Sequence, residues 1–193
     1  MRHSEDLNAE DKSSNSTGSW RRKMKNPPTN KKTAQQNLRT PGYLFEEVSR
    51  RFGPFDVDVA ADGDNALCLD YLDLESNALA QTWVGRCWCN PPYKDIMPWV
   101  YKAIQSITKE RGCERVVMLL PARVGTEWYK WASMWGTIHR IVGRVRFERS
   151  NGEPMKNPFE DSILVVFERE INTKELLSRD KASKEAKSNA AES

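Results

Sequence analysis

In the segment 115–120 (RVVMLL), the residues after Arg115 form a short, unbroken apolar run that Pro121 closes. Such a run is typical of a strand buried on both faces of a parallel sheet, where helices cover the sheet on either side. Proline ends the run because it cannot donate the next hydrogen bond of a ladder. The run therefore predicts a central strand in a sheet that helices cover.

Three other segments space their apolar residues as a helix does. The first begins with Thr40 as the predicted capping residue and Pro41 at the first helical position, and it stops at Gly53-Pro54. The second covers residues 96–107, and the third follows Thr126, another predicted capping residue. The third contains a stripe of tryptophans that we interpret as core residues: Trp128, Trp131 and Trp135.

Further strand-like segments alternate with these helices, at residues 55–60, 86–89, 138–147 and 162–168. Residues 67–83 are expected to add a short strand or helix. Alternation of helices with strands predicts an α/β fold with a mostly parallel sheet and crossover helices. The last two strands have little helical signal between them, which predicts an antiparallel hairpin at one edge of the sheet.

The two ends of the chain differ from this core. The folded domain is expected over residues 40–170, preceded by a disordered basic arm at 1–39 and followed by a polar tail at 171–193. Residues 13–39 carry seven basic residues and no acid, although the net charge of the whole chain is only +3. The arm would bind nucleic acid by releasing counterions from phosphates, or it is merely a solubilising tail.

Neither a membrane span nor a metal site is predicted. No apolar run is long enough to cross a bilayer and no signal peptide opens the chain, so we expect a soluble, intracellular protein with no membrane partner. The four cysteines lack a zinc-site pattern and are expected to be reduced and packed. Cys87 and Cys89 should share one face of their strand, with Trp88 on the other.

The tetrapeptide Asn90-Pro91-Pro92-Tyr93 follows the strand-like residues 86–89 directly. Open α/β sheets bind their ligands at the carboxyl ends of strands. An amine held for attack needs acceptors for its protons, which Asn90 Oδ1 and the Pro91 carbonyl can supply, while the Tyr93 ring can stack on a planar group. The set suits methyl transfer to an exocyclic or amide nitrogen; the alternative is an ordinary Asn-Pro turn.

The order of several short motifs extends this observation over nearly the whole core. Together they resemble the phage-type, Dam-like DNA N6-adenine methyltransferases, and they cover residues 40–168. The motifs are residues 40–45 (TPGYLF), 55–61 (FDVDVAA), 65–68 (NALC), 89–93 (CNPPY), 119–123 (LLPAR), 143–147 (GRVRF) and 162–167 (SILVVF).

The resemblance implies a Rossmann-like methyltransferase fold with S-adenosylmethionine as cofactor. It also implies action in the cytoplasm of a bacterial host, from a phage or prophage gene. The glycine-rich loop usual after the first strand of such enzymes is here reduced to Ala60-Ala61-Asp62-Gly63, so close backbone approach depends on small residues. An acid for the cofactor ribose is expected near the next strand end, at Asp73 or at Asp70. The other residues expected around the cofactor are Thr40, Pro41, Asp58, Ala60, Ala61 and Asn90; Asp58 could instead cap a turn.

By the same resemblance, the acceptor is the N6 amine of adenine in double-stranded DNA, flipped out of the stack. Asn90, Pro91, Pro92 and Tyr93 are the expected catalytic residues. Sequence preference is expected to be short or relaxed and to be read by residues 148–161. The candidates for DNA contact, besides the basic arm, are Lys94, Arg123, Arg144, Arg146 and Arg149.

Two alternatives stay open at this point. The first is a methyltransferase that acts on RNA adenine or on a protein glutamine, since an amide nitrogen is also planar and needs the same acceptors. The second is an inactive, nucleic-acid-binding relic of the fold.

Overall fold

The computed structural model of the chain describes residues 38–73, 75–110, 112–149, 152–155 and 160–169. The basic arm predicted at 1–39, apart from its last two residues, and the polar tail predicted at 171–193 lie outside these ranges. None of the helices in the described ranges combines the length and apolar character that a bilayer crossing requires.

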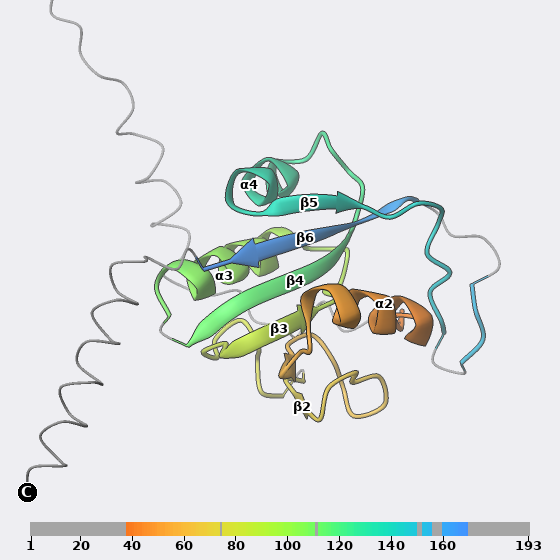
Figure 1. The fold of residues 1–193 in the computed structure, drawn as a ribbon, viewed down its shortest axis with the longest axis horizontal. Coiled ribbons are helices and arrows are strands. Elements are labelled where there is room, and N and C mark those ends of the chain that lie inside the picture. Colours follow the sequence, from red (N-terminus) through yellow and green to blue (C-terminus); the bar gives the residue numbers. More distant parts are fainter. Residues whose placement is uncertain (1–37, 74, 111, 150–151, 156–159, 170–193) are drawn as a thin grey trace, which may run out of the picture.

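The described residues form one six-stranded sheet with the order β2-β1-β3-β4-β6-β5 (Figure 1). Strands β2, β1, β3 and β4 are parallel neighbours, whereas β6 is antiparallel to both β4 and β5. The α/β class and the antiparallel pair at one edge are therefore confirmed. The strands are β1 (Val57–Asp58), β2 (Asp70–Tyr71), β3 (Gly85–Cys89), β4 (Cys113–Pro121), β5 (Thr137–Arg140) and β6 (Ser162–Glu168).

The chain reverses its direction of travel across the sheet at β1. From β1 it moves outward to β2, and from there it crosses to the other side of β1 to form β3. Such a switch point opens a crevice at the carboxyl ends of the two flanking strands, where ligands of open α/β sheets bind. Here those strand ends are Asp58 and Cys89, immediately before Asn90.

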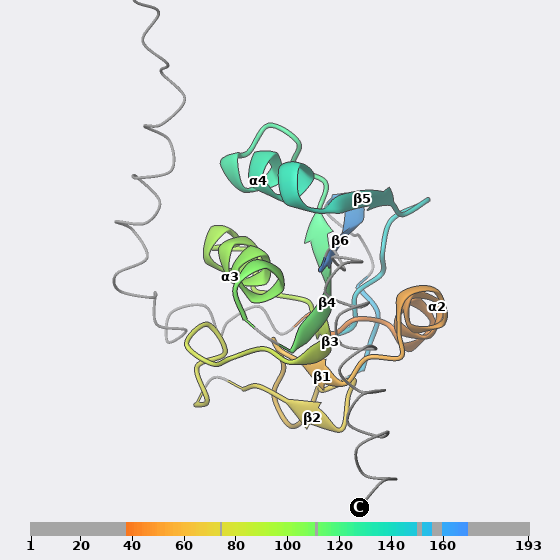
Figure 2. The ribbon, with the colours of Figure 1, turned by 60° about the vertical axis from the view of Figure 1, so that its left-hand side comes forward.

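Helices cover both faces of the sheet, as Figure 2 shows. Helix α2 (Gly42–Phe52) lies on one face, and α3 (Met97–Thr108) and α4 (Glu127–Trp135) lie on the other. Successive residues of β4 contribute to the two cores: Val116 and Met118 face α3 and α4, while Val117 and Leu119 face the side of α2. The prediction of a strand buried on both faces is confirmed.

Strand β3 divides its residues in the same way. Cys87 and Cys89 are fully buried beneath α3 and α4, and Trp88 is fully buried on the α2 side against Phe45 and Phe55. All four cysteines are free thiols, and no three side chains of His, Cys, Asp or Glu in the described ranges cluster as a metal site.

The predicted strand over 138–147 is wrong beyond Arg140. The chain leaves the sheet after β5 and passes Gly143, whose φ of +84° favours glycine. Val145 and Phe147 then pack beneath α2 without joining a ladder. Their alternating pattern therefore came from burial of a loop. The strand predicted over 55–60 is also shorter in the structure. The residues just before and just after β1 nevertheless bond to β3, since Asp56 N and Val59 N both donate to carbonyls of that strand.

The helix starts were predicted with mixed success. Thr126 caps α4 by accepting a hydrogen bond from Tyr129 N at 3.4 Å, as expected. Thr40 does not cap α2, because Pro41 holds the capping position and no side chain bonds there. The tryptophan stripe is core only in part: Trp128 is buried, but Trp135 is 45% exposed.

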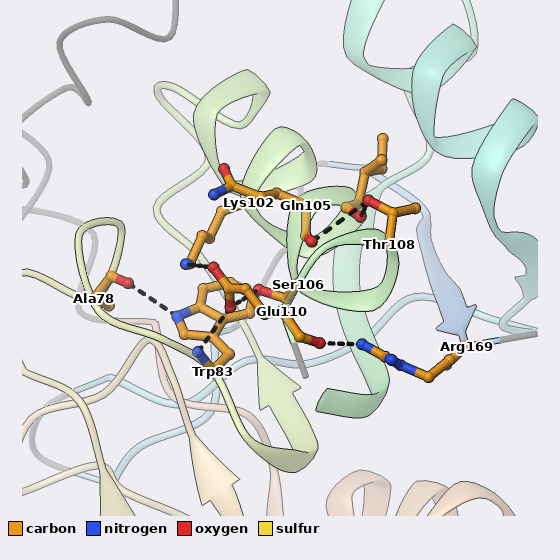
Figure 3. Close-up of polar contacts among 9 residues, drawn as sticks. Ala78, Trp83, Lys102, Gln105, Ser106, Thr108, Glu110 and Arg169 are labelled. Atoms are coloured by element: carbon orange, nitrogen blue, oxygen red, sulfur yellow. Dashed lines mark hydrogen bonds and ion pairs between the residues drawn. The ribbon is translucent and has the colours of Figure 1, made fainter. Parts of the chain in front are cut away.

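A buried ion pair joins α3 to the turns that precede β3 and β4 (Figure 3). Lys102 Nζ lies 2.5 Å from Glu110 Oε1, and the two side chains are only 7% and 13% exposed. Glu110 Oε2 accepts from Ser106 Oγ at 2.9 Å and from the backbone N–H of Trp83 at 3.1 Å. Arg169, just past β6, donates to the Glu110 carbonyl. This cluster lies at the amino ends of β3 and β4, opposite the Asn-Pro-Pro-Tyr turn.

Candidate active site

Asn90 leaves the sheet at the carboxyl end of β3 and has its amide group held in one orientation. Its Nδ2 donates to the Leu38 carbonyl and to Thr40 Oγ1, each at 3.1 Å. Within the described part of the chain, neither Asn90 Oδ1 nor the Pro91 carbonyl accepts a hydrogen bond. Within that part of the chain both oxygens are therefore open to an incoming donor, and their role as acceptors for an amine stays a prediction.

The remaining residues of the motif, Pro91 to Tyr93, pack closely against the protein beside Asn90. Pro91 is buried, whereas Pro92 and Tyr93 are partly exposed. The Tyr93 ring packs edge-on against Phe147, and its hydroxyl donates to the Leu119 carbonyl at 3.4 Å. Burial raises the pKa of Tyr93 well above its ordinary value, so the phenol stays protonated. Tyr93 as a whole residue is therefore only partly open to a ligand.

Thr40 and Pro41 come to Asn90 from the start of α2. Both residues are buried, and Thr40 is 6% exposed. The Thr40 hydroxyl oxygen accepts from Asn90 Nδ2. Thr40 thus contacts the Asn-Pro-Pro-Tyr turn although fifty positions separate the two in the sequence.

Asp58 ends β1 and organises the loop that follows. Its two carboxylate oxygens accept from the backbone N–H groups of Ala60 and Leu67, each at 3.2 Å, and the side chain is 3% exposed. Burial raises the pKa of Asp58 to about 7, although the two N–H groups oppose the shift. Asp58 therefore does what a turn-capping acid does, and it brings the small residues Ala60 and Ala61 to the switch point.

The contribution of Asp58 to stability is expected to fall as pH rises from about 4 to about 7. In the unfolded chain the carboxyl loses its proton near 3.8, whereas in the folded protein it keeps the proton until about 7, so rising pH favours unfolding across this window. Urea unfolding of the wild type and of Asp58→Ala at several pH values checks this. The wild type should lose stability relative to the variant as pH rises; a pH-independent difference would contradict it.

The two acids considered for the ribose lie at opposite ends of β2, with Asp70 at its start and Asp73 just beyond its end. Asp70 begins the strand, is exposed and pairs in register with Val57. Asp73 follows the strand at its carboxyl end, where its Oδ1 accepts from Ser76 N and Ser76 Oγ, both at 2.8 Å. These bonds hold the pKa of Asp73 below its ordinary value, so it is a carboxylate at neutral pH. Its position at the strand end favours Asp73.

Two of the five predicted DNA-contacting side chains are paired with acids. Arg123 donates to Glu160 at 2.8 and 2.6 Å, which raises the pKa of the guanidinium, and it reaches the Tyr93 carbonyl at 3.5 Å. Arg144 lies 3.4 Å from Asp161. Lys94, Arg146 and Arg149 are exposed. Phosphates would have to compete with Glu160 and Asp161 for Arg123 and Arg144.

Sequence reasoning missed the partners that fix Asn90 from outside its own turn. The Leu38 carbonyl belongs to a segment that was expected to be part of the disordered arm. Arg39 instead exchanges two backbone hydrogen bonds with Glu148, at 2.8 and 3.0 Å. Every residue has a main-chain carbonyl, so residue types could not predict the bond from Asn90 to Leu38 or the backbone pairing of Arg39 with Glu148.

Residues 28–192 match the family model described as DNA N-6-adenine-methyltransferase (Dam). A DNA N-6-adenine-methyltransferase of Haemophilus phage HP1 is 31% identical over 144 residues, which cover 72% of this chain and 82% of that protein. A second protein with that name, from Escherichia phage T1, is 33% identical over 92 residues, covering 47% of this chain and 37% of its own length. The resemblance predicted from the sequence is thereby confirmed, and the chain belongs to the DNA N-6-adenine-methyltransferase (Dam) family.

Proposed function

We propose that this protein transfers a methyl group from S-adenosylmethionine to the N6 amine of adenine in double-stranded DNA. Membership of the Dam family supports the reaction and the substrate. The observation that carries the proposal is the Asn90 amide: its NH2 group is used inside the protein, while its oxygen is left to accept. The sheet order, with a switch point at β1 and β3, supports a Rossmann-like methyltransferase fold.

In this proposal the Asn-Pro-Pro-Tyr turn holds the target amine. Asn90 Oδ1 and the Pro91 carbonyl accept its two protons, which draws the nitrogen toward tetrahedral geometry and aims its lone pair. Pro92 keeps the turn rigid, since proline fixes φ and needs no donor partner. The Tyr93 ring stacks on the flipped base. Catalysis is then mainly positioning and electrostatics.

The residues around the switch point fit a methyl donor with a polar, ribose-bearing body. The ends of β1, β2 and β3 bring together one carboxylate (Asp73), one amide (Asn90) and two small residues that allow close backbone approach. When bound, S-adenosylmethionine supplies an activated methyl group on a sulfonium. We assign its site to Thr40, Pro41, Asp58, Ala60, Ala61, Asp73 and Asn90, with Asp58 acting through the loop that it holds.

The substrate is best tested by direct detection of the product. Purified protein is incubated with S-adenosylmethionine and unmethylated DNA, RNA or a glutamine-containing protein extract, and the digests are analysed by mass spectrometry. We expect N6-methyladenine in DNA. Product in RNA or protein alone would favour the other methyltransferase classes, and no product in any of the three would favour an inactive relic.

Recognition of the DNA sequence is assigned to residues 148–161, and the preference is expected to be short or relaxed. Lys94, Arg146 and Arg149 are exposed for phosphate contact. Mapping of methylated adenines in DNA from bacterial cells that express the protein tests this, since a long, strict recognition sequence would contradict it.

Binding of S-adenosylmethionine is expected to raise the melting temperature, because a ligand selective for the folded state stabilises it. Asp73→Ala should reduce this rise by weakening affinity for the ribose. Asp70→Ala is the matched control, since Asp70 lies at the start of the same short strand and is exposed. Thermal denaturation with increasing cofactor checks both variants. An equal rise in Asp73→Ala and the wild type would move the ribose contact to another residue.

A further inference from the structure

The segment from Leu38 to Thr40 supplies both acceptors for the Asn90 amide. The Leu38 carbonyl takes one Nδ2 proton and the Thr40 hydroxyl oxygen takes the other, each at 3.1 Å. Since an amide nitrogen has two protons, its donor capacity is fully used. The amide plane and the direction of Oδ1 are therefore set by residues outside the catalytic turn.

The Leu38 carbonyl selects one of the two orientations of this amide. Rotating the amide by half a turn would place Oδ1 against the Leu38 carbonyl, where two acceptors would meet without a proton between them. The Thr40 hydroxyl is less restrictive, because it can donate or accept. The Leu38 carbonyl thus requires Nδ2 of Asn90, and not Oδ1, to face residues 38–40, and the Thr40 hydroxyl holds Nδ2 in that position.

The acceptors themselves are firmly positioned. Arg39, between them, exchanges two backbone hydrogen bonds with Glu148, and Glu148 also pairs with Pro154. Thr40 is 6% exposed, and the following residue, Pro41, is buried as the capping residue of α2. A side chain held this closely loses little further entropy when it orients a neighbour.

We propose that Thr40 is a positioning residue for methyl transfer, and that its hydroxyl acts on the reaction by holding the Asn90 amide with Oδ1 toward the target amine. The inference rests on the proposed function for the identity of that amine. It gives the Thr40 side chain a role through Asn90, distinct from any contact of its backbone with the cofactor. Its effect therefore falls on turnover and leaves cofactor affinity nearly unchanged.

The test compares Thr40→Val, which keeps the shape and removes the hydroxyl, with Thr40→Ser, which keeps the hydroxyl. For Thr40→Val we expect kcat to fall between about tenfold and a hundredfold, the range that a slight misplacement of a reacting group produces. The KM for S-adenosylmethionine should change little, and Thr40→Ser should restore turnover. Unchanged turnover in Thr40→Val, or a loss confined to the KM for the cofactor, would overturn the proposal.

A spectroscopic measurement separates this inference from the proposed function. The Asn90 side-chain amide gives a pair of ¹H–¹⁵N resonances, identified by their disappearance in Asn90→Ala. Thr40→Val should shift these resonances in the cofactor-free protein, and Thr40→Ser should leave them near their wild-type positions. Unshifted Asn90 resonances in Thr40→Val would contradict a positioning role for Thr40 even if the enzyme methylates DNA. If the wild type methylates nothing, the proposed function is wrong, but the resonances still show whether Thr40 orients the Asn90 amide. If Thr40→Val does not fold, Thr40→Ala takes its place.

Discussion

Asn90→Ala is expected to lower methyl incorporation into unmethylated DNA by at least about a hundredfold, as loss of one oriented hydrogen-bonding group at a reacting centre does in other enzymes. The variant removes the acceptor Oδ1 and leaves the Pro91 carbonyl as the only remaining acceptor of the proposed pair. Single-turnover incorporation of labelled methyl groups, with enzyme in excess over the DNA and with saturating cofactor, measures the loss at the chemical step.

Asn90→Asp refines this experiment, because it keeps an oxygen for the target amine but loses the donor. One carboxylate oxygen would then face the Leu38 carbonyl, where Nδ2 now lies 3.1 Å away. We expect turnover between that of Asn90→Ala and that of the wild type. Both variants should still unfold in a single cooperative transition without cofactor, which would show that the fold persists. Wild-type turnover in Asn90→Ala would remove the proposed role of this residue.

Glu110→Ala is expected to lower the free energy of unfolding by about 3–5 kcal/mol, the usual effect of removing one partner from a buried ion pair. The substitution leaves the Lys102 ammonium, 7% exposed, without its carboxylate. It also removes the acceptor of the Trp83 N–H and the Ser106 hydroxyl. Urea unfolding at neutral pH measures the loss.

Two variants show whether burial is the cause. Glu47→Ala breaks an exposed pair with Arg50 on α2, and screening by water should leave stability almost unchanged. Lys102→Met removes the other partner of the buried pair, and it should cost less than Glu110→Ala because Glu110 keeps two donors. Equal effects of Glu110→Ala and Glu47→Ala would show that the buried cluster contributes nothing special. Methyl transfer per folded molecule should be unchanged in all three.

The sequence predicted those features that arise from neighbouring residues. The apolar run of β4 was read correctly because each residue from Val116 to Leu120 is buried by its own place in the strand. The alternation of Cys87, Trp88 and Cys89 was equally reliable, because successive side chains of a strand must face opposite ways. The position of Asn90 followed from the end of the same strand.

Features that depend on distant partners were not predictable in this way. Residues 141–147 carry a strand-like pattern, but they form a loop from which Val145 and Phe147 are buried beneath α2 while Val142 is fully exposed. Thr40 has the residue type of a helix cap and instead bonds to a side chain fifty positions away. The roles of Lys102 and Glu110 depend on the turn before β3, so neither charge could be identified as buried from the sequence.

In the proposed mechanism, the orientation of the Asn90 amide is set by the peptide oxygen of Leu38 and so depends little on the side chain at position 38. Any amino acid at position 38 presents the same carbonyl, so natural variation there need not disturb the chemistry. A one-residue insertion or deletion between positions 38 and 40 would displace the carbonyl oxygen of residue 38, although every sequence motif of the enzyme would still be present. In this chain, the spacing ahead of Thr40-Pro41 is therefore expected to matter more to the proposed role of Asn90 than the side chain at position 38.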